Sequence, residues 1–104
     1  MNLAKDIYTA TAEFPDSEKY GIISQMRRCS VSVPSNIAEG SSRSSNKEFA
    51  YFLQVALGSS FELETQLTLA GDLGFISLLH QTVLNDQIVL IQKKISNFLK
   101  TLNK

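Results

Sequence analysis

One cysteine and one histidine occur in the sequence, Cys29 and His80, and these two residue types supply most activated nucleophiles and bases. A nucleophile must lie within hydrogen-bond reach of its base. Cys29 falls on an apolar helical stripe, where cysteine acts as a small buried residue. His80 falls near the start of a different helix, and no pattern joins the two. We therefore expect a protein that is not an enzyme; an enzyme with an unrecognised site is the less favoured alternative.

Metal and cofactor motifs are missing from the sequence as well. Bundles with two metal ions use Glu-x-x-His pairs on facing helices, but Glu62 and Glu64 are only two residues apart and no Glu-x-x-His occurs. A structural zinc site would need more cysteine or histidine. The glycines form neither a P-loop nor a dinucleotide fingerprint. The sequence therefore predicts no metal and no cofactor.

A polar cluster flanks the expected turn near residue 43 and is the most informative group of side chains. Positions 28, 32, 36 and 39 share one helix face, opposite a second helix that carries acids. One interpretation is an ion-pair network that sets helix packing; the other is an anion-binding patch for phosphate backbones. The candidates for polyanion contact are Arg27, Arg28, Arg43 and Lys47. The candidates for a structural or interface role are Asn36, Glu39, Glu48 and Glu62.

The charge balance argues against a dedicated nucleic-acid binder. Ten basic and ten acidic residues cancel, whereas phosphate neutralisation usually needs a clear basic excess. The C-terminal twelve residues nevertheless carry lysines at 93, 94, 100 and 104 and no acid. Those lysines favour polyanions, or they complement the negative end of a helix dipole. RNA or DNA remains a candidate partner.

The bulk composition is that of a globular protein. Apolar residues make up 43% and charged residues 19% of the chain, which suits a single folded domain over residues 1–104. No apolar run approaches the roughly 20 residues that span a bilayer. One cysteine cannot form an intramolecular disulfide framework, and the N-terminus lacks a signal-peptide core. We expect a cytoplasmic protein with no membrane partner.

Two helices are expected before residue 40. An apolar stripe predicts the first from about Asn2 to Phe14, ended by Pro15. The second is predicted from about Ser17 to Glu39. Pro34 falls inside it and predicts a kink or break, with Asn36 bridging the freed backbone groups. Gly40 follows the second helix and suits a left-handed cap at its end.

Two longer helices are expected after residue 44. A capping box from Ser45 to Glu48 starts the third, which runs to about Leu73 and stops at Gly74. Ser77 caps the fourth, from about Leu78 to Leu102. Its apolar residues are spaced four, three, four, three and four apart, which is a heptad seam. The seam consists of Leu84, Ile88, Ile91, Ile95, Phe98 and Leu102.

The third and fourth helices also carry apolar side chains away from their main stripes. One four-helix core cannot cover every face of both helices, so the surplus predicts a subunit interface between copies of the chain. Scattered apolar surface residues are the alternative. The surplus comprises Tyr51, Val55, Leu57, Phe61 and Leu69 on the third helix, with Val83, Val89, Leu90 and Leu99 on the fourth.

Several longer strings of residues resemble one protein family. They are Tyr20–Arg28, Val33–Gly40, Lys47–Phe49, Phe52–Leu53, Ala56–Ser59 and Glu62–Leu67. The sequence resembles the bacterial four-helix-bundle proteins encoded by intervening sequences in 23S ribosomal RNA genes, a family that includes the accessory variability proteins of diversity-generating retroelements. The match covers about residues 14–76. Members usually carry more residues before the first helix, so this copy is expected to be shortened there.

The resemblance implies an all-α, up-down four-helix bundle that assembles as a ring-shaped homopentamer. The retroelement relatives are strongly basic and bind nucleic acid and a reverse transcriptase, whereas this chain is neutral. For most members no molecular function is established. The combined prediction is a non-catalytic homo-oligomeric scaffold or adaptor whose candidate partner is RNA, DNA or a protein. The alternative is a purely structural or protein-binding module that does not bind nucleic acid.

Overall fold

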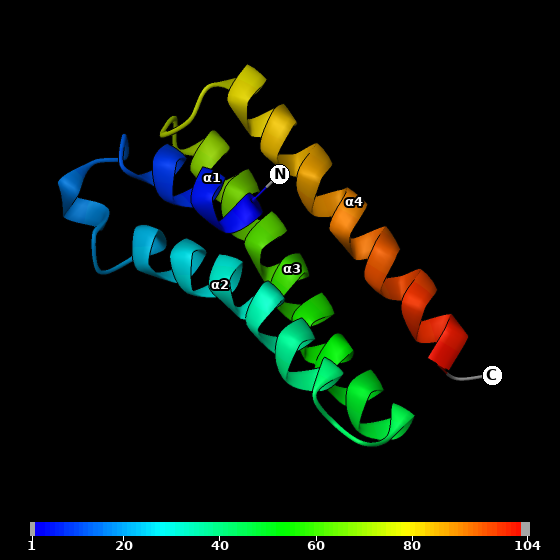
Figure 1. The fold of residues 1–104 in the computed structure, drawn as a ribbon. Coiled ribbons are helices and arrows are strands. Elements are labelled where there is room, and N and C mark those ends of the chain that lie inside the picture. Colours follow the sequence, from blue (N-terminus) through cyan, green and yellow to red (C-terminus); the bar gives the residue numbers. More distant parts are fainter. Residues whose placement is uncertain (1, 103–104) are drawn as a thin grey trace.

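The architecture comes from a computed structural model that describes residues 2–102. Four α-helices and one short 3₁₀ helix make up the described part of the chain, without strands. Each helix packs against the next one along the chain, and α4 packs back against α1 (Figure 1). This arrangement is a four-helix bundle, as the sequence predicted. The helices are α1 (Leu3–Thr11), α2 (Ile22–Ser41), α3 (Asn46–Asp72) and α4 (Leu78–Leu102).

The first helix is shorter than predicted. The Asn2 side chain accepts a hydrogen bond from the Lys5 amide at 3.1 Å and caps the start of α1. The helix ends at Thr11 instead of Phe14, because the Phe14 amide turns back to the Thr11 carbonyl at 3.1 Å. Phe14 still belongs to the buried stripe, since its side chain is only 4% exposed.

The start of the second helix was wrongly placed at Ser17. Residues Asp16–Glu18 instead form a short 3₁₀ helix, and α2 begins at Ile22. Gly21 separates the two with a non-helical backbone, φ −103° and ψ −114°. Asp16 and Ser17 resemble N-caps, but no regularly spaced apolar residue lies between Phe14 and Ile22, so the apolar pattern did not support a helix before Ile22.

The end of α2 also differs from the prediction. Gly40 lies inside the helix and is not a left-handed cap; among the described residues, only Gly74 has positive φ, at 77°. A Cβ at Gly40 would come within 2.8 Å of both Phe49 and Phe52 on α3. Glycine is needed at this position for the close approach of the two helices.

Pro34 does not break α2, which runs without interruption from Ile22 to Ser41. Asn36 donates from Nδ2 to the Ser32 carbonyl at 2.8 Å, whereas the carbonyl that loses its donor to Pro34 is that of Ser30. The expected bridge therefore forms two residues away from that carbonyl and not on it. The two halves of α2 contribute to separate core clusters, Met26 to the first and Val33 to the second.

The bounds of α3 and α4 match the prediction. The Ser45 hydroxyl accepts from the Glu48 amide at 3.1 Å, and the Ser77 hydroxyl accepts from the His80 amide at 3.1 Å. The heptad seam of α4 fails near its end. Leu99 is buried there, and Phe98 is 47% exposed, because a 3.6-residue period drifts away from a strict seven-residue repeat.

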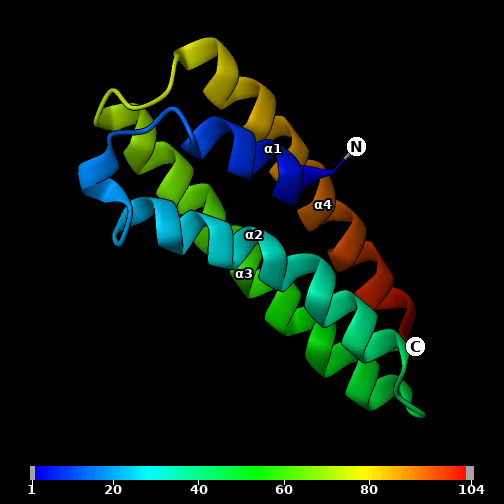
Figure 2. The same cartoon turned by 60° about the vertical axis from the view of Figure 1, so that its left-hand side comes forward.

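The core divides into two clusters along the bundle. The first cluster includes Ile7 of α1, Met26, Leu63 and Ile88, so it receives side chains from all four helices. The second is built by α2, α3 and α4 alone. Figures 1 and 2 show the cause, since α1 lies against only one half of the longer helices. The second cluster comprises Val33, Ala50, Leu53, Ala56, Ile95 and Leu99.

Candidate interaction surfaces

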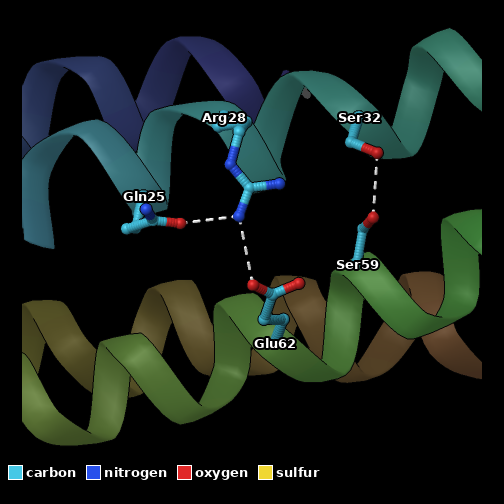
Figure 3. Close-up of polar contacts among 5 residues, drawn as sticks. All are labelled: Gln25, Arg28, Ser32, Ser59 and Glu62. Atoms are coloured by element: carbon cyan, nitrogen blue, oxygen red, sulfur yellow. Dashed lines mark hydrogen bonds and ion pairs between the residues drawn. The ribbon is translucent and has the colours of Figure 1, made fainter.

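A polar seam joins α2 to α3, as shown in Figure 3. Arg28 donates to the Glu62 carboxylate at 3.2 Å and to Gln25 Oε1 at 2.6 Å. One turn further along α2, the Ser32 and Ser59 hydroxyls are hydrogen-bonded at 2.8 Å. An ion-pair network that sets helix packing was one of the two interpretations that the sequence left open, and Arg28 and Glu62 form such a pair between α2 and α3. Both side chains are at least half exposed, so this ion pair contributes little to stability and mainly fixes the register of the helices.

Arg27 points to a different face of α2 from Arg28, because consecutive helical residues lie about 100° apart. Its Nε donates to the Thr11 hydroxyl at 2.9 Å, and its guanidinium lies 4.6 Å from the centre of the Tyr8 ring. These contacts fasten α1 to α2. The sequence did not indicate them, since Thr11 and Tyr8 carry no motif that marks an arginine partner.

Arg43 and Lys47 lie at the α2–α3 turn. Arg43 forms an ion pair with Glu39 one turn earlier and sits 4.9 Å from the centre of the Phe52 ring. Lys47 and Glu48 are exposed on the first turn of α3. The four candidate polyanion residues therefore occupy three separate places: the α1–α2 contact, the polar seam and the α2–α3 turn.

Cys29 and His80 are far from forming a catalytic pair. Cys29 is fully buried in the first core cluster, whereas His80 is exposed on the first turn of α4. Burial raises the pKa of the Cys29 thiol, and the nearby Glu62 carboxylate raises it further. A thiol that is buried and protonated is a poor nucleophile.

Metal-ligand clusters and membrane-spanning helices are absent from the part of the chain that the structure describes. Within residues 2–102, no three His, Cys, Asp or Glu side chains cluster as metal ligands do. Over the same range, every helix is too short or too polar to cross a bilayer.

Apolar side chains cover the outer face of α3, the side turned away from the core. We define this outer face by Tyr51, Val55, Gly58 and Leu69, which recur at helical spacing. Tyr51 is 62% exposed and Leu69 is 49% exposed. The outer side of α4 carries a similar row, in which Leu79 is 78%, Val83 48% and Leu90 43% exposed. Of the predicted surplus, Leu57 and Val89 are partly buried and Leu99 is buried.

A groove opens between α2 and α4 beside the first turn of α1. It has a volume of about 310 Å³. Its lining is apolar apart from Ser30 and Asn2, and none of the lining side chains is ionisable. The groove could not be seen in the sequence, because its existence depends on which half of the bundle α1 covers. The short apolar stripe before Pro15 was the one available signal. The apolar lining residues are Leu3, Ala4, Val33, Pro34, Ile37 and Ile91.

Comparisons with known proteins give a family and a fold. A family model described as 23S rRNA-intervening sequence protein matches residues 1–97. A crystal structure from Bacteroides thetaiotaomicron VPI-5482, of a protein with unknown function from the S23 ribosomal protein family, superposes with a TM-score of 0.83. It shares 22% identity and covers 93% of this chain and 88% of its own. No curated protein matches the sequence significantly.

Proposed function

Because the chain belongs to the 23S rRNA-intervening sequence protein family, we propose that it is a non-catalytic helical bundle that self-associates and serves as a scaffold or adaptor. The inert surroundings of Cys29 and the absence of ionisable groups from the groove support the non-catalytic part. The observation that carries the self-association is the outer face of α3.

Gly58 is the most informative residue of that outer face. It lies in the interior of a 27-residue helix, where glycine costs about 1 kcal/mol relative to alanine. Among the described residues, none has an atom within 4 Å of a Cβ built at Gly58, so packing inside the subunit does not require a glycine. Close approach of a second helix from another copy would require one. Val55, one turn away and 37% exposed, and Tyr51 would flank such a contact.

The outer sides of α3 and α4 differ, and this favours a ring. If the α3 face of one copy packs against the α4 face of the next, the contact is heterologous, and it forms a ring when the rotation between neighbouring copies closes. We propose a closed ring on this basis. Five subunits is the number that the family resemblance implies.

Substitution on the outer face of α3 tests self-association directly. The double variant Val55→Glu/Leu69→Glu places two charges on the proposed interface. It should raise the subunit dissociation constant at least tenfold, which corresponds to a loss of about 1.4 kcal/mol of association free energy. Sedimentation velocity over a dilution series would measure the shift. The matched control is Thr9→Glu/Thr68→Glu, which adds two charges at other exposed positions of α1 and α3. Equal dissociation constants for the two variants would contradict the proposed interface.

Nucleic-acid binding is a second candidate function, favoured by how charge is distributed along the bundle. Residues 49–92 contain four acids and no lysine or arginine, whereas residues 93–102 contain three lysines and no acid. The neutral total therefore conceals a basic end, because the last turns of α4 lie in the same half of the bundle as the α2–α3 turn (Figure 1), where Glu39 and Glu48 balance Arg43 and Lys47. A phosphate backbone is the polyanion that such an end would attract.

Filter binding of a structured RNA at several salt concentrations tests this second candidate. If the basic end binds phosphates, Lys93→Ala/Lys100→Ala should weaken retention and reduce the slope of log affinity against log salt by about 1.5 to 2. The control Lys5→Ala/Lys19→Ala removes the same charge from the other half of the bundle and should leave the slope unchanged. Failure of the wild-type chain to retain RNA at low salt would reject RNA binding.

A further inference from the structure

The two ends of the furrow between α2 and α4 are filled differently. Its first half is occupied by α1, which has 9 residues, whereas α3 and α4 have 27 and 25 (Figures 1 and 2). The Asn2 side chain caps the first turn of α1. Beyond that cap the furrow continues as the α2–α4 groove, which begins at Ser30 and Val33 of α2 and Ile91 of α4.

Several apolar side chains in this half of the bundle are exposed or only partly buried. Phe49 of α3 is only partly buried, and its ring lies tilted against that of Phe98, with 5.2 Å between the ring centres. Phe98 is 47% exposed and follows Ile91 by two turns on the same side of α4. Ile37 of α2 is likewise only partly buried. Phe49 and Phe98 therefore add apolar surface beyond the lining of the groove, toward the C-terminal end of α4.

The occupant of the first half of the furrow indicates what fits the second. The helix α1 packs there through Leu3, Ile7 and Ala10, spaced four and three residues apart. The remaining length follows about 11 residues of α4, or about 16 Å, which is three turns of a helix. A small polar ligand would find few groups to orient it, since Ser30 and Asn2 are the polar residues of the lining.

Charge on the same half of the bundle specifies the occupant further. Lys94 follows Ile91 by three residues and therefore lies on the groove side of α4, and Lys93 and Lys100 lie nearby on the same helix. We propose that the α2–α4 groove binds an amphipathic helix of a partner protein. That helix lies end to end with α1, places apolar residues at four- and three-residue spacing into the groove, and carries acids on its flanks. This partner site is separate from the outer face of α3 proposed for self-association.

A synthetic peptide probe tests the groove. The peptide has 14 residues, with leucines spaced four, three and four apart, glutamates on the opposite face and one tryptophan among the apolar residues. The chain contains no tryptophan, so the fluorescence reports the peptide alone. Binding should shift its emission to the blue with a dissociation constant on the order of 10 μM. A peptide of the same composition with its leucines spread around the helix should not bind.

A matched pair of phenylalanine variants locates the peptide. Phe98→Glu alters the groove, whereas Phe61→Glu alters a phenylalanine of similar exposure, 50%, on α3. Phe98→Glu should weaken binding at least about tenfold, and Phe61→Glu less than about twofold. Lys94→Glu should weaken binding several-fold at low salt and provides a second test if Phe98→Glu lowers helicity by circular dichroism.

Three outcomes would overturn the proposed partner site. The first is no blue shift with the wild-type chain at about 200 μM peptide. The second is equal weakening by Phe98→Glu and Phe61→Glu. The third is a fall in particle mass for Phe98→Glu alone, which would assign the groove to a second copy of the chain. Loss of self-association in Val55→Glu/Leu69→Glu with peptide binding intact would support the groove as a site separate from the outer face of α3.

Discussion

Replacing Leu63 by alanine is expected to lower the free energy of unfolding by about 3 kcal/mol. Leu63 is completely buried in the first core cluster, where side chains from all four helices meet. Removing its branched end loses the transfer free energy of the buried atoms and leaves a cavity that the neighbouring helices cannot fully close. Urea unfolding followed by circular dichroism would measure the difference.

Leu69→Ala is the matched control for Leu63→Ala, since it makes the same change on the same helix at a side chain that is 49% exposed. Its effect should stay below about 1 kcal/mol at protein concentrations where copies are dissociated. Similar losses for the two variants would mean that Leu63 does not occupy the centre of the core.

Two glycine-to-alanine substitutions are expected to change stability in opposite directions. Gly40→Ala should lower the free energy of unfolding by about 2 kcal/mol, because the new Cβ would meet Phe49 and Phe52 at 2.8 Å and force α2 and α3 apart. Gly58→Ala should raise it by about 1 kcal/mol, because the helix gains propensity and the new methyl meets nothing within 4 Å.

Denaturant unfolding of both alanine variants in dilute solution would measure these changes. Because each variant adds the same methyl group to a helix, the difference between them isolates the local packing. A stabilising Gly40→Ala would show that α2 and α3 are farther apart at their turn than the structure places them. A destabilising Gly58→Ala in dissociated subunits would show that Gly58 is needed inside the subunit.

The long helices were predictable because their ends carry chemical signals. Ser45 and Ser77 cap α3 and α4, Gly74 adopts the left-handed conformation after α3, and the apolar stripes between these residues are long. Such signals act within a few residues of each other, so the sequence displays them directly. An ion pair between the second and third helices was one interpretation of the sequence, but the sequence did not specify Arg28 and Glu62 as its partners, because that depends on which faces of the two helices meet.

The errors share a different cause, which is that distant contacts decided the local conformation. Gly40 follows an apparent helix end and resembles a cap, yet the Phe49 ring and the Phe52 Cβ leave no room for a side chain on this helical residue. Asp16 and Ser17 resemble helix caps, yet Asp16–Glu18 form a separate 3₁₀ helix and α2 begins only after Gly21. Phe98 and Leu99 exchange roles because the fourth helix follows its own period after Ile95.

The candidate sites were predictable only in part. No pattern in the sequence joined Cys29 to His80, and the structure keeps Cys29 buried and His80 exposed on a different helix. The grouping of the basic residues was less accessible, because Arg27 turns toward Tyr8 and Thr11 while Arg28 turns toward Glu62. The groove could not be predicted from the sequence, since its existence depends on α1 covering only half of the bundle.

The central claim is that the exposed apolar faces of α3 and α4 bring copies of the chain together. Light scattering coupled to size-exclusion chromatography, performed on the wild-type chain at micromolar concentration, tests this most directly. The subunit mass is 11.5 kDa, and the proposal predicts a discrete particle several times heavier. A well-folded particle of single-chain mass throughout the micromolar range would contradict it.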